Sequence, residues 1–134
     1  MFWRRCPGIV AFAVSFIFLA QADALAQLRG HGGAVRDLAI SPDGATAISG
    51  SFDSSAIRWS LARNAAEQVL RFHADAVNAV GFLKDGRVVT AGADGRIALW
   101  RAGRQQPDTI FEGHSAPIAA LAVSPDSSML ATAS

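Results

Sequence analysis

A histidine, a hydroxyl side chain and an aspartate recur together in this 134-residue sequence. The two sets are His31, Ser49 and Asp53, then His73, Thr90 and Asp94. In hydrolases, a serine or threonine oxygen attacks a carbonyl while a histidine takes its proton and an aspartate orients the histidine. The residue types therefore raise the question of nucleophilic catalysis, and the surrounding sequence must decide it.

The neighbourhood of each set repeats along the chain. His31, His73 and His114 are separated by 42 and then 41 residues, and Trp59 and Trp100 by 41. Self-similarity at a fixed period of this length is typical of repeat architectures. The sequence therefore predicts several copies of one small structural unit.

Each unit shows the pattern of short strands joined by tight turns. Apolar or small β-prone runs end at turn residues such as Pro42 and Gly44, which suit the dihedral angles of a β-turn. The predicted strands are 35–40, 45–51, 57–59 and 68–72, then 77–82, 88–93, 97–100 and 109–111, then 118–123 and 129 onwards. Four strands in about 41 residues predict one blade of a β-propeller.

The combination of motifs resembles the WD40 repeat family. Gly30-His31 is followed by a Ser-Pro-Asp-Gly turn at 41–44, by Ser-Gly-Ser-x-Asp at 49–53 and by a strand that ends in Trp59. The resemblance implies an all-β WD40-type β-propeller with about two and a half four-stranded blades, which is an incomplete propeller. Blade one is expected at about 30–71, blade two at about 72–112 and a partial blade three at about 113–134, all within a repeat region at 27–134.

The sequence departs from the family pattern at a few positions. Ser60 and Arg101 replace the aspartate that follows the tryptophan, Phe72 replaces the glycine before His73, and Ser127 replaces the turn glycine. The chain also ends within the second strand of blade three, so we expect the remaining propeller blades to be missing from this sequence.

The resemblance implies that the recurring residues form structural tetrads. The expected members are His31, Ser49, Asp53 and Trp59, then His73, Thr90, Asp94 and Trp100, then His114 and Thr132. Hydrogen bonds among them would satisfy buried donors and acceptors. A catalytic triad is needed once, whereas this set recurs, and the sequence has no Gly-x-Ser-x-Gly nucleophile elbow. We therefore expect no catalytic residue and no enzyme activity.

Metal and cofactor sites are not predicted either. The three histidines lie in separate units without neighbouring ligands, and Cys6 is the sole cysteine. No zinc site, disulfide framework or Cys-x-x-Cys-His haem motif is present in the sequence.

The first 26 residues have the pattern of a signal peptide. Arg4 and Arg5 precede an apolar run at 9–20, and small residues follow at 22–26. As a helix the run rises only about 18 Å, too short for a hydrocarbon core of about 30 Å, which disfavours a retained membrane anchor. The sequence predicts cleavage after Ala26, no stable membrane anchor afterwards, and a periplasmic or secreted protein. A cytoplasmic protein whose true start lies near Leu28 is the alternative.

Charge and surface residues indicate the kind of partner. Residues 1–26 hold two of the 12 basic and one of the 11 acidic side chains, so residues 27–134 are formally neutral and show no footprint for nucleic acid. The resemblance implies that partners bind the face that carries the loop between the fourth strand of one blade and the first strand of the next, and Phe52 is the candidate anchor there because large aromatic side chains dominate binding energy at interfaces. The alternative is that Phe52 packs against its own loop. We predict an exported protein-interaction scaffold. The alternative is the non-catalytic propeller portion of a larger periplasmic electron-transfer protein with c-type haem, or of an enzyme.

Overall fold

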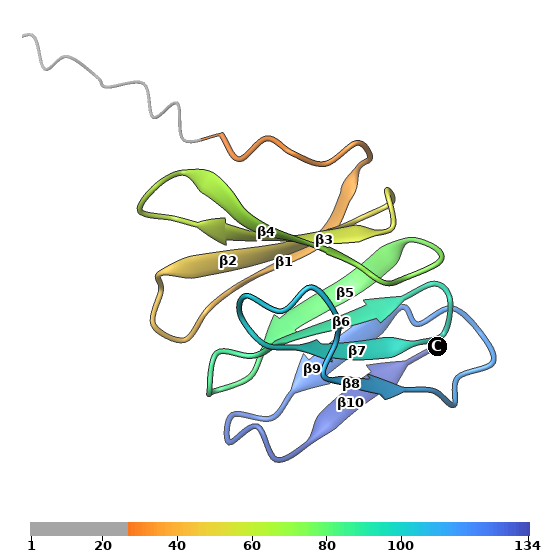
Figure 1. The fold of residues 1–134 in the computed structure, drawn as a ribbon. Coiled ribbons are helices and arrows are strands. Elements are labelled where there is room, and N and C mark those ends of the chain that lie inside the picture. Colours follow the sequence, from red (N-terminus) through yellow and green to blue (C-terminus); the bar gives the residue numbers. More distant parts are fainter. Residues whose placement is uncertain (1–26) are drawn as a thin grey trace, which may run out of the picture.

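The computed structural model describes residues 27–134, and the predicted signal peptide lies outside them. This region contains ten β-strands arranged in three antiparallel sheets, in the orders β1-β2-β3-β4, β5-β6-β7-β8 and β10-β9 (Figure 1). The first sheet contains β1 (Val35–Ile40), β2 (Thr46–Ser51), β3 (Ser55–Ser60) and β4 (Ala65–Arg71). The second contains β5 (Val77–Phe82), β6 (Val88–Gly92), β7 (Ile97–Trp100) and β8 (Thr109–Phe111), and the third β9 (Ala120–Val123) and β10 (Leu130–Ala133). The predicted all-β class is confirmed.

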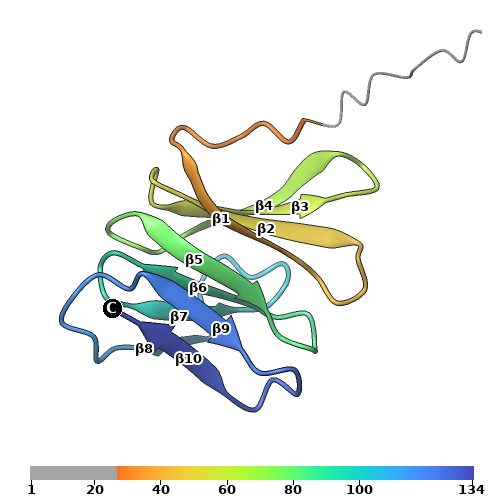
Figure 2. The same ribbon diagram turned by 180° about the vertical axis from the view of Figure 1, so that it is seen from behind.

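The three sheets are stacked face to face as successive blades. β1 packs against β5, and β5 packs against β9, so the first strand of each sheet lies beside the first strand of the next. Figures 1 and 2 show this row from both sides, with the first sheet at the top and the third at the bottom. The arrangement is that of an incomplete propeller, and we call the sheets blades one, two and three.

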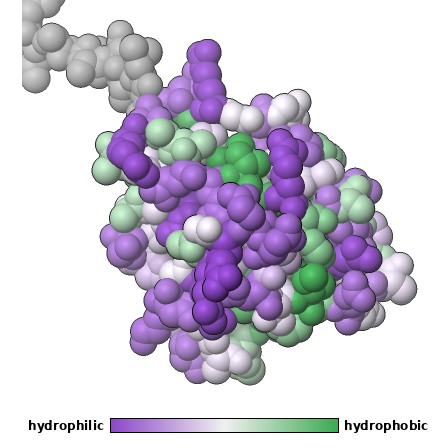
Figure 3. Space-filling view, in the orientation of Figure 1, coloured by the Kyte–Doolittle hydropathy of each residue, from purple (hydrophilic) through white to green (hydrophobic). Residues whose placement is uncertain are grey.

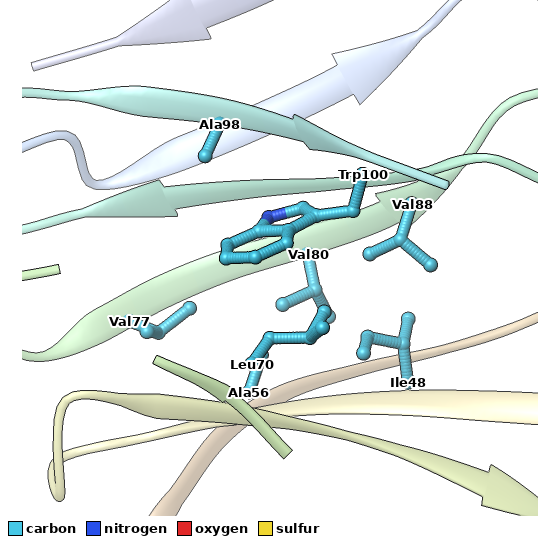
Figure 4. Close-up of a cluster of buried hydrophobic side chains, with 8 residues drawn as sticks. All are labelled: Ile48, Ala56, Leu70, Val77, Val80, Val88, Ala98 and Trp100. Atoms are coloured by element: carbon cyan, nitrogen blue, oxygen red, sulfur yellow. The ribbon is translucent and has the colours of Figure 1, made fainter. Parts of the chain in front are cut away.

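Apolar side chains from blades one and two fill the space between them (Figure 4). Ile48, Ala56 and Leu70 of blade one meet Val80 and Trp100 of blade two, and all five are at most 5% exposed. Removing apolar surface from water stabilises such contacts by about 25 cal/mol per Å². Each blade therefore depends on its neighbour for the burial of its faces.

Polar contacts also join neighbouring blades. The Val80 N–H donates to Asp37 Oδ2 at 2.9 Å, and the side-chain amide of Asn78 donates to the Ile118 carbonyl at 2.9 Å. The side chains that make these two contacts, Asp37 and Asn78, both lie at β-bulges. The register of β1 with β2 shifts between Val35 and Asp37, and that of β5 with β6 shifts between Val77 and Ala79. A bulge turns a side chain out of the regular ladder, which allows it to reach the next blade.

The turn residues explain why one departure from the family pattern is tolerated. Gly44 has φ of 71°, and Ser127 at the equivalent place has φ of 59°. A non-glycine residue in this region is strained by about 1 kcal/mol or more. Hydrogen bonds within the turn offset that strain, because Asp126 accepts bonds from the Ser124 and Ser128 hydroxyls and the Ser128 N–H. These bonds, led by that of Ser124, lower the pKa of Asp126 to about 2.

Three strands begin two or more residues away from the predicted start, and the other boundaries agree within one residue. β3 begins at Ser55 instead of residue 57, because Ser55 and Ala56 pair with Arg71 and Leu70 of β4. β4 begins at Ala65 instead of residue 68, because hairpin pairing with β3 extends over exposed residues that show no apolar alternation. β9 begins at Ala120 instead of residue 118, because the Ile118 N–H donates to the Gly92 carbonyl in blade two, outside the pairing with β10.

Surface hydropathy agrees with this packing. Figure 3 shows hydrophilic side chains over most of one side of the molecule, with hydrophobic surface limited to smaller areas between them. Leu38 and Val35 on the outer face of blade one are 62% and 53% exposed, whereas Val80 and Val77, 42 residues later in blade two, are 5% and 0% exposed. The exposures differ because blade one covers this face of blade two, whereas the equivalent face of blade one is uncovered in this structure.

Candidate functional site: the histidine–aspartate networks and their edge of the blades

Blade two contains a continuous chain of four hydrogen-bonded side chains. Trp100 Nε1 donates to Thr90 Oγ1 at 3.0 Å, and Thr90 Oγ1 lies 2.9 Å from His73 Nε2. His73 Nδ1 lies 3.0 Å from Asp94 Oδ1. The chain runs from the third strand through the second to the loop before the first strand and back to the β6–β7 turn. It joins β6, β7, the turn between them and the loop that enters the blade.

The partners determine where the protons of this chain lie. A carboxylate only accepts, so His73 Nδ1 must carry a proton and donate to Asp94. In the neutral imidazole, Nε2 then accepts from the Thr90 hydroxyl, whose oxygen accepts from the indole of Trp100. Every donor in the chain meets an acceptor.

Blade one contains the same chain with serine in place of threonine. Trp59 Nε1 donates to Ser49 Oγ at 2.8 Å, Ser49 Oγ lies 2.8 Å from His31 Nε2, and His31 Nδ1 lies 3.0 Å from Asp53 Oδ2. Ser55 adds a further contact, because its hydroxyl donates to Asp53 Oδ1 at 2.6 Å. The structure therefore brings together all four residues of each expected tetrad in blades one and two.

Blade three brings together its two predicted residues. His114 Nε2 lies 2.8 Å from Thr132 Oγ1, and His114 Nδ1 lies 3.1 Å from Ser134 Oγ. Thr132 is half-buried, whereas Thr90 is 1% exposed. The blade-three pair is therefore closer to solvent than its counterpart in blade two.

Hydrogen bonds hold the tetrad aspartates in their ionised form. Burial by itself raises the pKa of Asp53, but bonds from the Ser55 hydroxyl, the Gly32 N–H and His31 outweigh it and lower the pKa well below its ordinary value. Burial also raises the pKa of Asp94, but hydrogen bonds from the Ala74 N–H, His73 and the Arg96 N–H outweigh it and lower the pKa. Both carboxylates thus also hold the loop that enters their blade, through its backbone N–H.

The distances resemble those of a catalytic triad, but the surroundings of the hydroxyl do not. An attacking oxygen needs a free approach and donors for the developing oxyanion. Ser49 and Thr90 are 7% and 1% exposed, and an indole N–H occupies a lone pair of each oxygen. A hollow of about 340 Å³ adjoins Ser49, but its lining is mainly apolar and belongs to the outer face of blade one. This arrangement is suited to holding strands together.

Phe52 lies in the β2–β3 turn directly before Asp53 and is 55% exposed. The Arg36 guanidinium carbon lies 4.8 Å from the centre of the Phe52 ring. Sequence reasoning predicted Phe52 and missed Arg36, because the contact depends on the bulge in β1 that follows Val35. No motif in the sequence marks that bulge.

Metal and membrane features are absent from the part of the chain described. Residues 27–134 place no three histidine, cysteine, aspartate or glutamate side chains where they could share a metal ion. Within the same range, no helix has the length and apolar character needed to cross a bilayer.

Comparison with protein families agrees with the repeated geometry. The family model described as WD domain, G-beta repeat, matches residues 23–60, 65–101 and 105–134. The chain belongs to the WD40 repeat family. The second matched repeat starts with β4 of blade one and ends with β7 of blade two, so one sequence repeat spans two sheets. Neighbouring blades are therefore linked by the chain as well as by packing.

Several curated proteins are similar to this chain over part of their length. Methylosome protein WDR77 of Xenopus laevis is 35% identical over 81 residues, which cover 59% of this chain and 24% of that protein. Telomerase protein component 1 of Mus musculus is 28% identical over 100 residues, covering 72% of this chain and 4% of that protein. Ribosome biogenesis protein YTM1 of Scheffersomyces stipitis is 29% identical over 100 residues, covering 64% and 21%. The chain spans about a quarter or less of the length of these relatives.

Proposed function

We propose that this protein is an exported WD40-repeat scaffold that binds a protein partner and catalyses no reaction. The observation that carries the proposal is the repeated tetrad, in which the residue types capable of chemistry are engaged with one another inside the blades. The surfaces of the blades are therefore the parts available to bind a partner. One similar protein is named as a methylosome protein and another as a telomerase component, which supports a role within assemblies.

Partner binding is assigned to the edge of the blades that carries the tetrad aspartates. Phe52 offers an exposed aromatic side chain there, in a turn held by the bond from its N–H to the Ala34 carbonyl at 3.0 Å. A rigid aromatic group on a fixed turn binds with little loss of conformational entropy.

The test is a pull-down with the full chain and two single variants. We expect Phe52→Ala to lose one or more partners, while Met129→Ala keeps them, because Met129 is also exposed, at 70%, but lies in the β9–β10 turn at the opposite edge of the blades. A partner set that survives Phe52→Ala unchanged contradicts the assignment to this edge.

Export to the periplasm or outside the cell is proposed from residues 1–26 alone. The relatives named above are eukaryotic proteins, and nothing in their names bears on export. We expect the mature protein to begin at Gln27, and N-terminal sequencing of the purified protein checks this. A mature protein that retains Met1, found in the cytoplasm, contradicts the proposal. A Cys-x-x-Cys-His motif elsewhere in the same gene would favour the alternative of a haem-containing electron-transfer protein.

A further inference from the structure

An exposed cation–aromatic pair stands at the edge that carries the tetrad aspartates. It consists of Arg36 in the β1 bulge and Phe52 in the β2–β3 turn, with the guanidinium carbon 4.8 Å from the ring centre. Both side chains are exposed. A guanidinium stacked on a ring uses its flat face and leaves the N–H groups in its plane free to donate.

The acidic groups nearest in the chain accept hydrogen bonds from other donors and form no ion pair with Arg36, so its guanidinium N–H groups remain available to a ligand. Among the described residues, no ion pair includes Arg36. Asp37 accepts the N–H of Leu38 through Oδ1 and that of Val80 through Oδ2. Asp53 accepts bonds from His31, the Gly32 N–H and Ser55.

Comparison with blade two shows that the pair is not needed for packing between blades. Asn78, 42 residues after Arg36, donates to the Ile118 carbonyl of blade three. In blade one, Asp37 makes the bond to the next blade, so Arg36 takes no part in it. Ala93 occupies the position 41 residues after Phe52, and blade two therefore lacks the aromatic partner.

We infer that the Arg36–Phe52 pair binds a glutamate or aspartate side chain of an acidic peptide segment in the partner protein. This inference rests on the proposed interaction role of this edge. A carboxylate meets the two parallel N–H groups of a guanidinium in a bidentate, charge-assisted contact. The other face of the Phe52 ring receives the aliphatic part of the peptide, and exposed small residues beside it, such as Gly32 and Ala34, allow a peptide backbone to approach closely.

A carboxylate in blade two adds to the negative charge of Asp53 on the same edge. Asp75, in the loop that enters blade two, is exposed and accepts the Ala76 N–H at 2.7 Å. A second acidic group near it would be repelled.

The test is fluorescence anisotropy of the full chain with three labelled peptides of equal length, whose repeating units are Glu-Ala-Gly, Gln-Ala-Gly and Lys-Ala-Gly. We expect only the glutamate peptide to bind, and binding should weaken with added salt because the contact is exposed. Arg36→Glu should weaken it by about tenfold or more, and Arg36→Lys by less, because lysine retains the charge without the paired donors. Phe52→Leu should weaken it by about threefold, since it removes the ring that orients the guanidinium.

The matched control is Arg104→Glu, which makes the same change of charge in the β7–β8 turn at the opposite edge of the blades. It should leave binding within about twofold, because surface charges further apart than about 10 Å are screened. The inference is overturned if the glutamate peptide does not bind, if the glutamine or lysine peptide binds equally well, or if Arg104→Glu weakens binding as much as Arg36→Glu. In each case the pull-down with Phe52→Ala still tests the interaction role by itself.

Discussion

Replacing Thr90 with valine removes only the hydroxyl that links the tryptophan and histidine of blade two. Valine has nearly the same shape as threonine and is equally suited to the buried strand β6, so packing is retained. The hydroxyl accepts from Trp100 Nε1 and meets His73 Nε2, and Thr90 is 1% exposed. Water therefore has no room to replace it, and two buried polar groups lose their partner.

The expected cost follows from these two orphaned groups. A buried polar group left without a partner costs about 1–3 kcal/mol, so Thr90→Val should lower the free energy of unfolding by about 2–6 kcal/mol. The matched control is Thr132→Val in blade three. Its hydroxyl meets only His114 and is half-buried, so the loss should be about 1 kcal/mol or less. Thr90→Ser keeps the hydroxyl, as Ser49 does in blade one, and should cost about 1 kcal/mol for the lost methyl group.

Urea unfolding of the three variants measures these differences. Tryptophan fluorescence and far-ultraviolet circular dichroism should report coincident transitions. The slope of the free energy of unfolding against urea concentration should be unchanged, because the surface exposed on unfolding is the same. A loss for Thr90→Val no larger than that for Thr132→Val would refute the reasoning that the hydroxyl has a structural role. Thr90→Ser keeps the test informative if the valine variant does not fold.

Further outcomes follow from the same networks. The pKa values of Asp53 and Asp94 are lowered in the folded state, so their ionised forms stabilise the fold at any pH above the ordinary pKa of about 3.9. This contribution is lost as the pH falls below that value. The melting temperature should therefore drop steeply between about pH 4 and 2, and less steeply in Asp53→Asn. Ester hydrolysis should proceed at the background rate in both the unaltered protein and Ser49→Ala, while this substitution lowers the melting temperature. If the unaltered protein instead hydrolysed esters above background and Ser49→Ala abolished that activity, Ser49 would be a nucleophile. Gly92→Ala should destabilise by about 1–3 kcal/mol in urea unfolding, because its Cβ would lie 2.5 Å from both Asp94 Oδ1 and the Nδ1 of the tetrad histidine. Asp37→Ala should cost about 1–3 kcal/mol by the same assay, since it leaves the buried N–H at the junction of blades one and two without an acceptor; no change there would mean that this bond does not contribute.

The sequence alone predicted the features that depend on contacts within one blade. In blade two, His73, Thr90, Asp94 and Trp100 lie within 27 residues of one another, and the strands that carry them are joined by short turns. Repetition of their spacing predicted an all-β fold built from one repeating unit, and the resemblance to the WD40 family implied that the four side chains meet within one blade. The same pattern left open the start of β4 at Ala65, because exposed strand residues carry no apolar alternation.

Only the tertiary structure decided which side chains act between blades and at their edge. Asp37 and Asn78 reach the next blade, and Arg36 reaches Phe52, from bulges whose positions depend on the pairing of whole strands. Val35 and Val77 are the same residue type at the same place in the repeat, and their exposures of 53% and 0% differ because a blade covers one and not the other. Local sequence sets the hydrogen bonds within a blade, whereas burial and free charge depend on what packs against it.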